Sequence, residues 1–122
     1  MYYKVAKRAA EWWVEQMKKR CKHHYPEKVI CDNVDIVIVD TSLRDELSRF
    51  QEILIDEIHT NLKKSNYTCL TCSHFPSAEL SGILKKANIS AFYLPVHAEM
   101  EIIGTSITVS TNGNHEYKLN VS

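Results

Sequence analysis

Residues 43–62, with the sequence LRDELSRFQEILIDEIHTNL, carry the clearest periodic pattern in the chain. Their apolar positions recur at steps of three or four, which places them on one face of a helix: Leu43, Leu47, Phe50, Leu54, Ile58 and Leu62. Ile53 and Ile55 make this face wider than the narrow seam of a coiled coil. The pattern predicts a helix over about residues 43–64 that packs on a globular core.

The segment just before this helix is dense in β-branched residues. Residues 34–39 read VDIVIV, which favours a short strand. Because its apolar residues do not alternate with polar ones, this strand would be buried on both faces. Asp40, Thr41 and Ser42 then offer side chains that cap helix N-termini, and Ser42 with Asp45 has the spacing of a capping box. We therefore expect the helix to start near Leu43.

A second long helix is expected at the N-terminus, from about Tyr3 to Lys22. An apolar stripe runs through this segment at steps of four: Val5, Ala9, Trp13, Met17 and Cys21. Trp12 lies on the flank of the stripe, so it either widens the buried face or contacts a partner. Pro26 ends the helix, because proline disfavours helical geometry in the residue before it.

Residues 65–77 look like a polar loop, and a short third helix follows. Ser77 is a suitable N-cap for this helix, and Asn88 can take the left-handed conformation that ends it. Residues 91–94 precede Pro95 and predict a short or edge strand.

The C-terminal third predicts a β-meander. Residues 97–103 and 106–111 pair across Gly104-Thr105, where glycine suits the first position of a type II′ turn. A three-residue loop at 112–114 then keeps the apolar face in register with the last strand. The residues expected to be buried are Met100, Ile102, Ile107, Val109, Tyr117 and Leu119. Those expected to face water are Glu99, Glu101, Thr108 and Ser110.

Together these elements predict one α+β domain over residues 1–122. Two long helices and one short helix would pack on one face of a small antiparallel sheet, with a further strand at 34–39. Fifteen Lys and Arg balance fifteen Asp and Glu, which excludes a polycation of the histone kind and a strongly acidic nucleic-acid mimic. No run of about 18 apolar residues and no signal-peptide pattern is present, so we expect a cytoplasmic protein without membrane contact.

One cluster has the residue types of a metal site. Cys69, Cys72 and His74 could supply three ligands of a tetrahedral zinc site, completed by a cysteine or histidine from residues 21–31. The alternative is that the cysteines are ordinary small apolar residues. Since the motif is not repeated, no cofactor is the simpler expectation and zinc is the alternative.

The sequence favours a protein that is not an enzyme. No glycines surround a serine as in a nucleophile elbow, and no glycine-rich phosphate loop is present. Cysteine and histidine pairs for thiol chemistry can be drawn, but six histidines and four cysteines always allow some pairing.

The leading functional hypothesis is a binding module that acts on a protein partner or on a second copy of itself. Aromatic residues outside the predicted core are the candidate contacts, since interfaces are rich in them: Trp12, Tyr3, Tyr25, Tyr67 and Phe75. A regulatory or inhibitory accessory role suits a chain of this size. The motifs identify no known family, and an origin in a bacterial phage or another mobile element is a prior expectation that the residues do not establish.

The alternative is a binder of nucleic acid or nucleotide phosphate. Residues 1–30 hold eight Lys and Arg against three Glu, whereas residues 31–62 hold eight acidic residues against two Arg. Either these two segments are neighbours in the fold, or the basic end of the first helix binds phosphate groups. The residues concerned would be Lys18, Lys19, Arg20, Lys22, His23 and His24.

Overall fold

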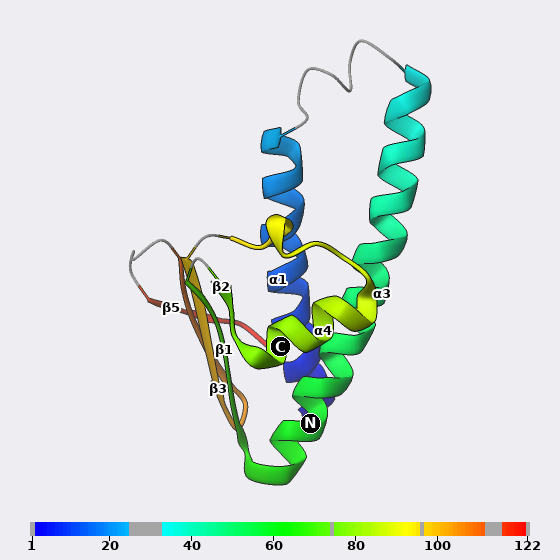
Figure 1. Ribbon diagram of the computed structural model, residues 1–122. Helices are drawn as coiled ribbons and strands as arrows, with labels where there is room; N and C mark the ends of the chain where they lie inside the picture. Colours follow the sequence, from blue (N-terminus) through cyan, green and yellow to red (C-terminus); the bar gives the residue numbers. More distant parts are fainter. Residues whose placement is uncertain (1, 25–32, 74, 96, 112–115, 122) are drawn as a thin grey trace.

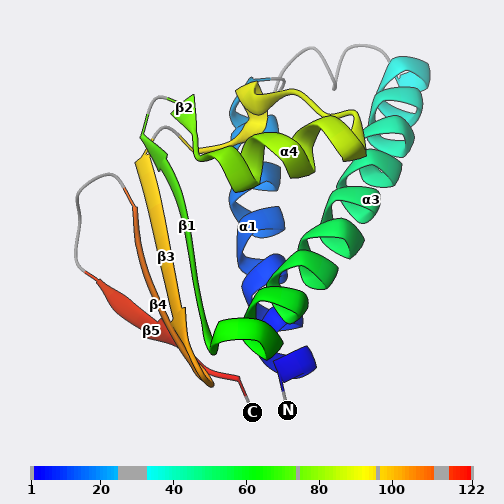
Figure 2. The same cartoon turned by 60° about the horizontal axis from the view of Figure 1, so that its bottom comes forward.

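The structure, a computed structural model, describes residues 2–24, 33–73, 75–95, 97–111 and 116–121, with the side chains of 20–43 and 92 excepted. Its elements form one antiparallel sheet with the helices on one side (Figures 1 and 2). In chain order they are α1 (Tyr2–His24), α3 (Asn33–Ser65), β1 (Tyr67–Ser73), β2 (Phe75–Pro76), α4 (Ala78–Ala87), the 3₁₀ helix η1 (Ala91–Tyr93), β3 (His97–Ile103), β4 (Ser106–Thr111) and β5 (Tyr117–Leu119). The strand order is β2-β1-β3-β4-β5. The predicted α+β fold is confirmed.

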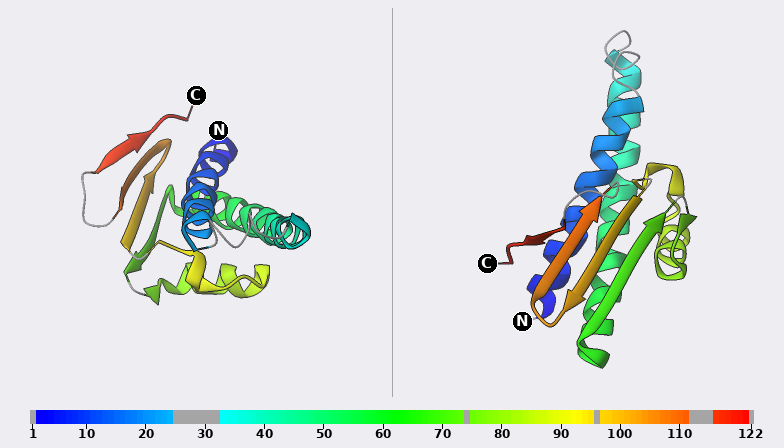
Figure 3. Two further views of the ribbon diagram at one scale, coloured as in Figure 1. Left: turned by 90° about the horizontal axis from the view of Figure 1, so that it is seen from above. Right: turned by 90° about the vertical axis from the view of Figure 1, so that its left-hand side faces the viewer.

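Helix α1 follows its predicted bounds closely. Its stripe residues Val5, Ala9, Trp13 and Met17 are fully buried, because one side of the helix faces α3 and the other faces the sheet (Figure 3). Trp12 is also buried, at 2% exposure. Trp12 therefore widens the buried face of this helix.

Helix α3 contains the predicted helix but starts ten residues earlier, at Asn33. The strand expected at 34–39 and the N-cap expected at 40–42 are both wrong, since these residues continue the same helix. A strand needs partner strands for its backbone hydrogen bonds, whereas an existing helix grows without a second nucleation step. The lower helix propensity of Val and Ile, a few tenths of a kcal/mol per residue, does not outweigh that difference.

The loop expected at 65–77 is also wrong over most of its length, because residues 67–73 form β1. Asn66 makes the turn out of α3 with a positive φ of 61°, and its carbonyl accepts a hydrogen bond from the Gly104 amide at 2.9 Å. All seven residues of β1 pair with β3. Thr68 and Cys72 point inward and are buried, so residues that look polar in the sequence serve the core.

The short helix α4 is confirmed at both ends. The Ser77 hydroxyl accepts a hydrogen bond from the Leu80 amide, and Asn88 adopts the left-handed conformation at φ 57°. The strand expected at 91–94 is wrong, because Ala91–Tyr93 is a 3₁₀ helix. Pro95 cannot donate to a strand ladder, and this short segment instead crosses over toward α1.

The meander has the predicted register. Ile102 lies opposite Ile107, Met100 opposite Val109, Val109 opposite Tyr117 and Ile107 opposite Leu119. Gly104 has φ 61°, whereas the φ of Thr105 is not positive. A type II′ turn requires this combination. Burial of Tyr117 is wrong, since this residue is 47% exposed at the edge of the sheet. The loop at 112–114 lies outside the described residues.

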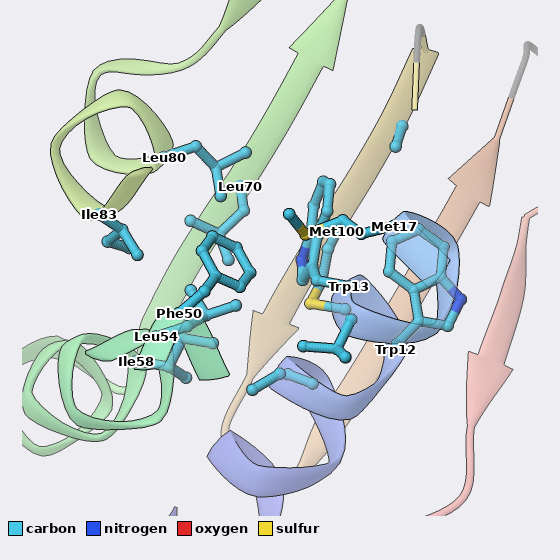
Figure 4. Close-up of a cluster of buried hydrophobic side chains, with 14 of the residues drawn as sticks. Trp12, Trp13, Met17, Phe50, Leu54, Ile58, Leu70, Leu80, Ile83 and Met100 are labelled. Atoms are coloured by element: carbon cyan, nitrogen blue, oxygen red, sulfur yellow. The ribbon is translucent and has the colours of Figure 1, made fainter. Parts of the chain in front are cut away.

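The core fills the space between helices and sheet in two connected parts (Figure 4). Trp12, Trp13 and Met17 of α1 lie over β3 and β4, and Phe50 and Leu54 of α3 face Leu70 of β1 and Leu80 of α4. The apolar stripe of residues 47–62 and the inward row of the meander therefore belong to one core, as the sequence pattern requires.

Candidate protein-interaction surface

The sheet has a second face that none of the described elements covers. Figure 3 shows it in the right-hand view, with the helices behind the strands. Since side chains alternate along a strand, the residues between the buried ones point to this side. We call this surface the outer face: Tyr67, Cys69, Thr71, Ser73, Phe75, His97, Glu99, Glu101, Ile103, Ser106, Thr108, Ser110 and Lys118.

Large apolar side chains lie at both ends of the outer face. Tyr67 is 44% exposed and lies directly opposite Ile103, which is 53% exposed. Phe75 is 81% exposed and pairs with Ser73 at the other end of β1. These are three of the five exposed large apolar residues of the described chain, which makes the outer face its main apolar surface.

The other two exposed aromatic residues have contacts inside the molecule. The Tyr117 hydroxyl accepts a hydrogen bond from the buried Trp12 indole at 2.9 Å. Tyr3 on α1 packs edge-on against His59 of α3, with ring centroids 6.1 Å apart. Both residues therefore have an evident structural role, whereas Phe75 is the most exposed of the five.

The middle of the outer face is polar and carries two carboxylates. Glu101 lies between Cys69 on β1 and Thr108 on β4, and Glu99 lies between Thr71 and Ser110. The Tyr67 hydroxyl donates to Glu101 at 3.4 Å, a long and weak hydrogen bond. The outer face therefore has apolar ends and a polar middle that carries negative charge.

Two titratable groups on this face are shifted in the same direction. The pKa of the Cys69 thiol is raised, chiefly by partial burial; a hydrogen bond with Tyr67 lowers it, and the carboxylates of Glu101, Glu99 and Glu79 raise it further. The pKa of the Tyr67 hydroxyl is raised, chiefly by repulsion from Cys69. Cys69 is therefore protonated at neutral pH and is a poor nucleophile, because the thiolate is the reactive form.

The predicted chelate of Cys69 and Cys72 is wrong. Residues three apart on a strand point to opposite faces, and here Cys69 lies on the outer face while Cys72 is buried in the core. The two sulfurs cannot reach one ion in this conformation. His74 lies outside the described residues, and within the described part of the chain no three metal-ligating side chains come together.

One pair on the outer face has the residue types of a nucleophile and its base. The Ser73 hydroxyl and His97 Nδ1 are 3.1 Å apart. A shallow hollow of about 560 Å³ lies elsewhere, at the C-terminal end of α4, and its lining includes Leu84, Lys85 and Ile89 but neither Ser73 nor His97. This hollow and the Ser73–His97 pair therefore lie apart.

The predicted partner-binding residues have different outcomes. Tyr67 and Phe75 lie on the outer face, and Tyr3 is exposed on α1. Trp12 is buried and is not available for contact with a partner in this conformation. Tyr25 lies outside the described residues. Ile103 was missed, although the alternation that places Ile102 in the core already places its neighbour on the opposite face.

The predicted phosphate-binding residues belong to another part of the molecule. Lys18 and Lys19 are exposed on α1, whose C-terminal end projects past the sheet (Figure 1). The side chains of the remaining four, from Arg20 to His24, lie outside the described set. No described contact joins Lys18 or Lys19 to the outer face.

Comparison with known protein families, with curated proteins and with solved structures finds no match to this chain. Among the residues that the structure describes, no helix combines the length and the apolarity needed to cross a bilayer. The functional conclusion therefore depends on the surface itself.

Proposed function

We propose that the protein is a non-enzymatic binding module that acts stoichiometrically on a protein partner through its outer face. The observation that carries this proposal is the exposure of Tyr67, Ile103 and Phe75 on a sheet face that no described element covers. A regulatory or inhibitory accessory role is the form of action that such a module would take.

The size of the outer face suits reversible binding. Seven residues at about 3.3 Å each, and four or five strands at about 4.8 Å each, give a surface of roughly 20 Å by 20 Å. That footprint is about 400 Å², roughly half of the 800 Å² that each partner of a standard specific interface contributes, so binding through this face alone is expected to be weak and transient. Burial of a large apolar side chain contributes about 1.5–3 kcal/mol, so three anchors can offset a part of the cost of association.

The nucleic-acid alternative has less support. The carboxylates in the middle of the outer face repel phosphate, so a phosphate ligand would have to bind at the basic end of α1 and not at the outer face. Of the six basic residues on which that alternative depends, Lys18 and Lys19 are the two whose exposure is described. Protein binding is therefore the function we propose.

The proposal is tested by replacing the three anchors with small polar residues. A variant carrying Tyr67→Ser, Phe75→Ser and Ile103→Thr should keep its thermal stability within a few degrees, because exposed side chains contribute little to folding. Its recovery of the partner by affinity purification from expressing cells, quantified by mass spectrometry, should fall by about tenfold or more. Tyr3→Ser is the matched control, since it removes an exposed aromatic residue on α1.

Two results would overturn the proposal. One is that the triple variant recovers the same partner in the same amount as the unmodified protein. The other is that the unmodified protein and the Tyr3→Ser control recover no partner that the triple variant lacks.

A further inference from the structure

Among the described residues, no Lys or Arg lies directly across the strands from Glu99 or Glu101, and His97 lies two residues before Glu99 on the same face. Across the strands, the neighbours of Glu99 are Thr71 and Ser110, and those of Glu101 are Cys69 and Thr108. Lys118 on β5 shares the face, but it lies opposite Thr108 of β4 and is therefore one strand further from the carboxylates. The middle of the face therefore presents two carboxylates whose nearest cross-strand neighbours are neutral.

A third carboxylate adds to the same field. Glu79 lies in the first turn of α4 and is exposed. Together with Glu101 and Glu99 it raises the pKa of the Cys69 thiol, after the larger effect of burial. Glu79 therefore adds to the negative charge near Cys69, which Glu99 and Glu101 on β3 already supply.

The apolar anchors flank this acidic centre. Tyr67 and Ile103 form one end, and Phe75 beside Ser73 forms the other. Six residue steps along β1 separate the ends, which is roughly 20 Å. A helix covers that distance in about 13 residues. Helices are also what the other face of this sheet packs against, as α1 and α3 do.

The exposed acidic surface of α3 competes for a cationic partner on charge alone. It carries Asp45, Glu52 and Asp56, all exposed. None of the exposed large apolar residues of the described chain lies on α3, however. The combination of carboxylates and apolar anchors therefore distinguishes the outer face from residues 44–65 of α3, the part of this helix whose side chains are described.

We propose that the partner presents a basic amphipathic helix to the outer face, with Lys or Arg side chains over Glu99 and Glu101 and apolar side chains at both ends. This inference rests on the proposed function. A second copy placed face to face would set the same carboxylates against one another, which disfavours a symmetric dimer here. A nucleic acid would bring phosphates onto them.

The test uses the full chain and two synthetic peptides of about 15 residues. One is helical, with lysines between terminal leucines, and the other has glutamate at every lysine position. Backbone amide chemical shifts should move at Thr71, Glu99, Glu101 and Thr108 with the lysine peptide. The dissociation constant should be about tenfold larger for the glutamate peptide. The affinity for the lysine peptide should fall as the salt concentration rises.

Charge-neutral variants separate this surface from the rest of the molecule. A variant with Glu99→Gln and Glu101→Gln should bind the lysine peptide with about tenfold lower affinity. Glu52→Gln with Asp56→Asn on α3 removes the same charge and should leave its affinity unchanged. Both pairs are exposed, so the fold should be retained in each.

The inference is overturned if the lysine peptide shifts α3 residues instead, if both peptides bind equally, or if the outer-face pair binds as tightly as the unmodified chain. Dimerisation of the free chain that depends on Glu99 and Glu101 would also overturn it. The two proposals can fail separately. If the triple variant loses its protein partner but the chain binds both peptides equally, the proposed function stands and only the inference of a basic helix is overturned.

Discussion

Tyr117 shows how one oxygen atom can matter on a half-exposed side chain. The buried Trp12 indole donates to the Tyr117 hydroxyl at 2.9 Å, which joins α1 to the last strand. Tyr117→Phe leaves that N–H group buried without an acceptor, so the free energy of unfolding should fall by about 1–3 kcal/mol. Chemical denaturation measures this change, and Tyr67→Phe, which removes a 3.4 Å bond on the surface, should change it by less than about 0.5 kcal/mol. Equal effects in the two variants would contradict this role for Tyr117.

At this scale the sequence predicts positions better than contacts. The stripe of α1 correctly places Trp13 in the core, but Trp12 lies on its flank, where helix geometry alone allows either outcome. Its burial depends on Tyr117, a partner 105 residues away in the chain. Local periodicity contains no information about such a pairing, and for the same reason Tyr117 was wrongly placed in the core.

Among the elements, the β3–β4 hairpin and helix α4 allow a matched test with glycine. Gly104 has φ 61° and Gly82 lies in the interior of α4, and an added Cβ meets nothing closer than 3.5 Å at either position. Gly104→Ala should therefore lower the free energy of unfolding by about 1–2 kcal/mol through backbone strain alone. Gly82→Ala should raise it by about 0.5–1 kcal/mol. Thermal or urea unfolding gives both signs, and a stabilising Gly104→Ala would show that the turn is not type II′.

The elements that were predicted correctly are those with a clear periodicity. Helix α4 and the meander each have a periodicity that their cap or turn residues support, whereas the stripe of residues 43–62 was predicted from its periodicity alone, since its expected N-cap is wrong. The predictions for residues 34–39 and for the segment that forms β1 were wrong for a common reason. Whether VDIVIV or YTCLTCS forms a strand depends on whether an unpaired strand edge is available, and β3 offers that edge to β1.

For the whole molecule, the division of the sheet into a covered and an open face is the feature with functional meaning. The covered face was predictable, because buried residues leave a periodic signal. The open face was predictable only in part: Tyr67 and Phe75 were candidates, but the alignment of Ile103 with Tyr67 arises from the pairing of β1 with β3. A surface assembled from several strands of a sheet depends on the topology and not on any single segment.

Site-specific photo-crosslinking in cells that express the protein is the most direct measurement of the central claim. A benzophenone side chain in place of Thr71 lies in the middle of the outer face, and one in place of Glu52 lies on the exposed side of α3 as the control. The outer face as a docking surface predicts a protein adduct of discrete mass from position 71 and none from position 52. Adducts from position 52 alone, or no adduct from position 71, would contradict it.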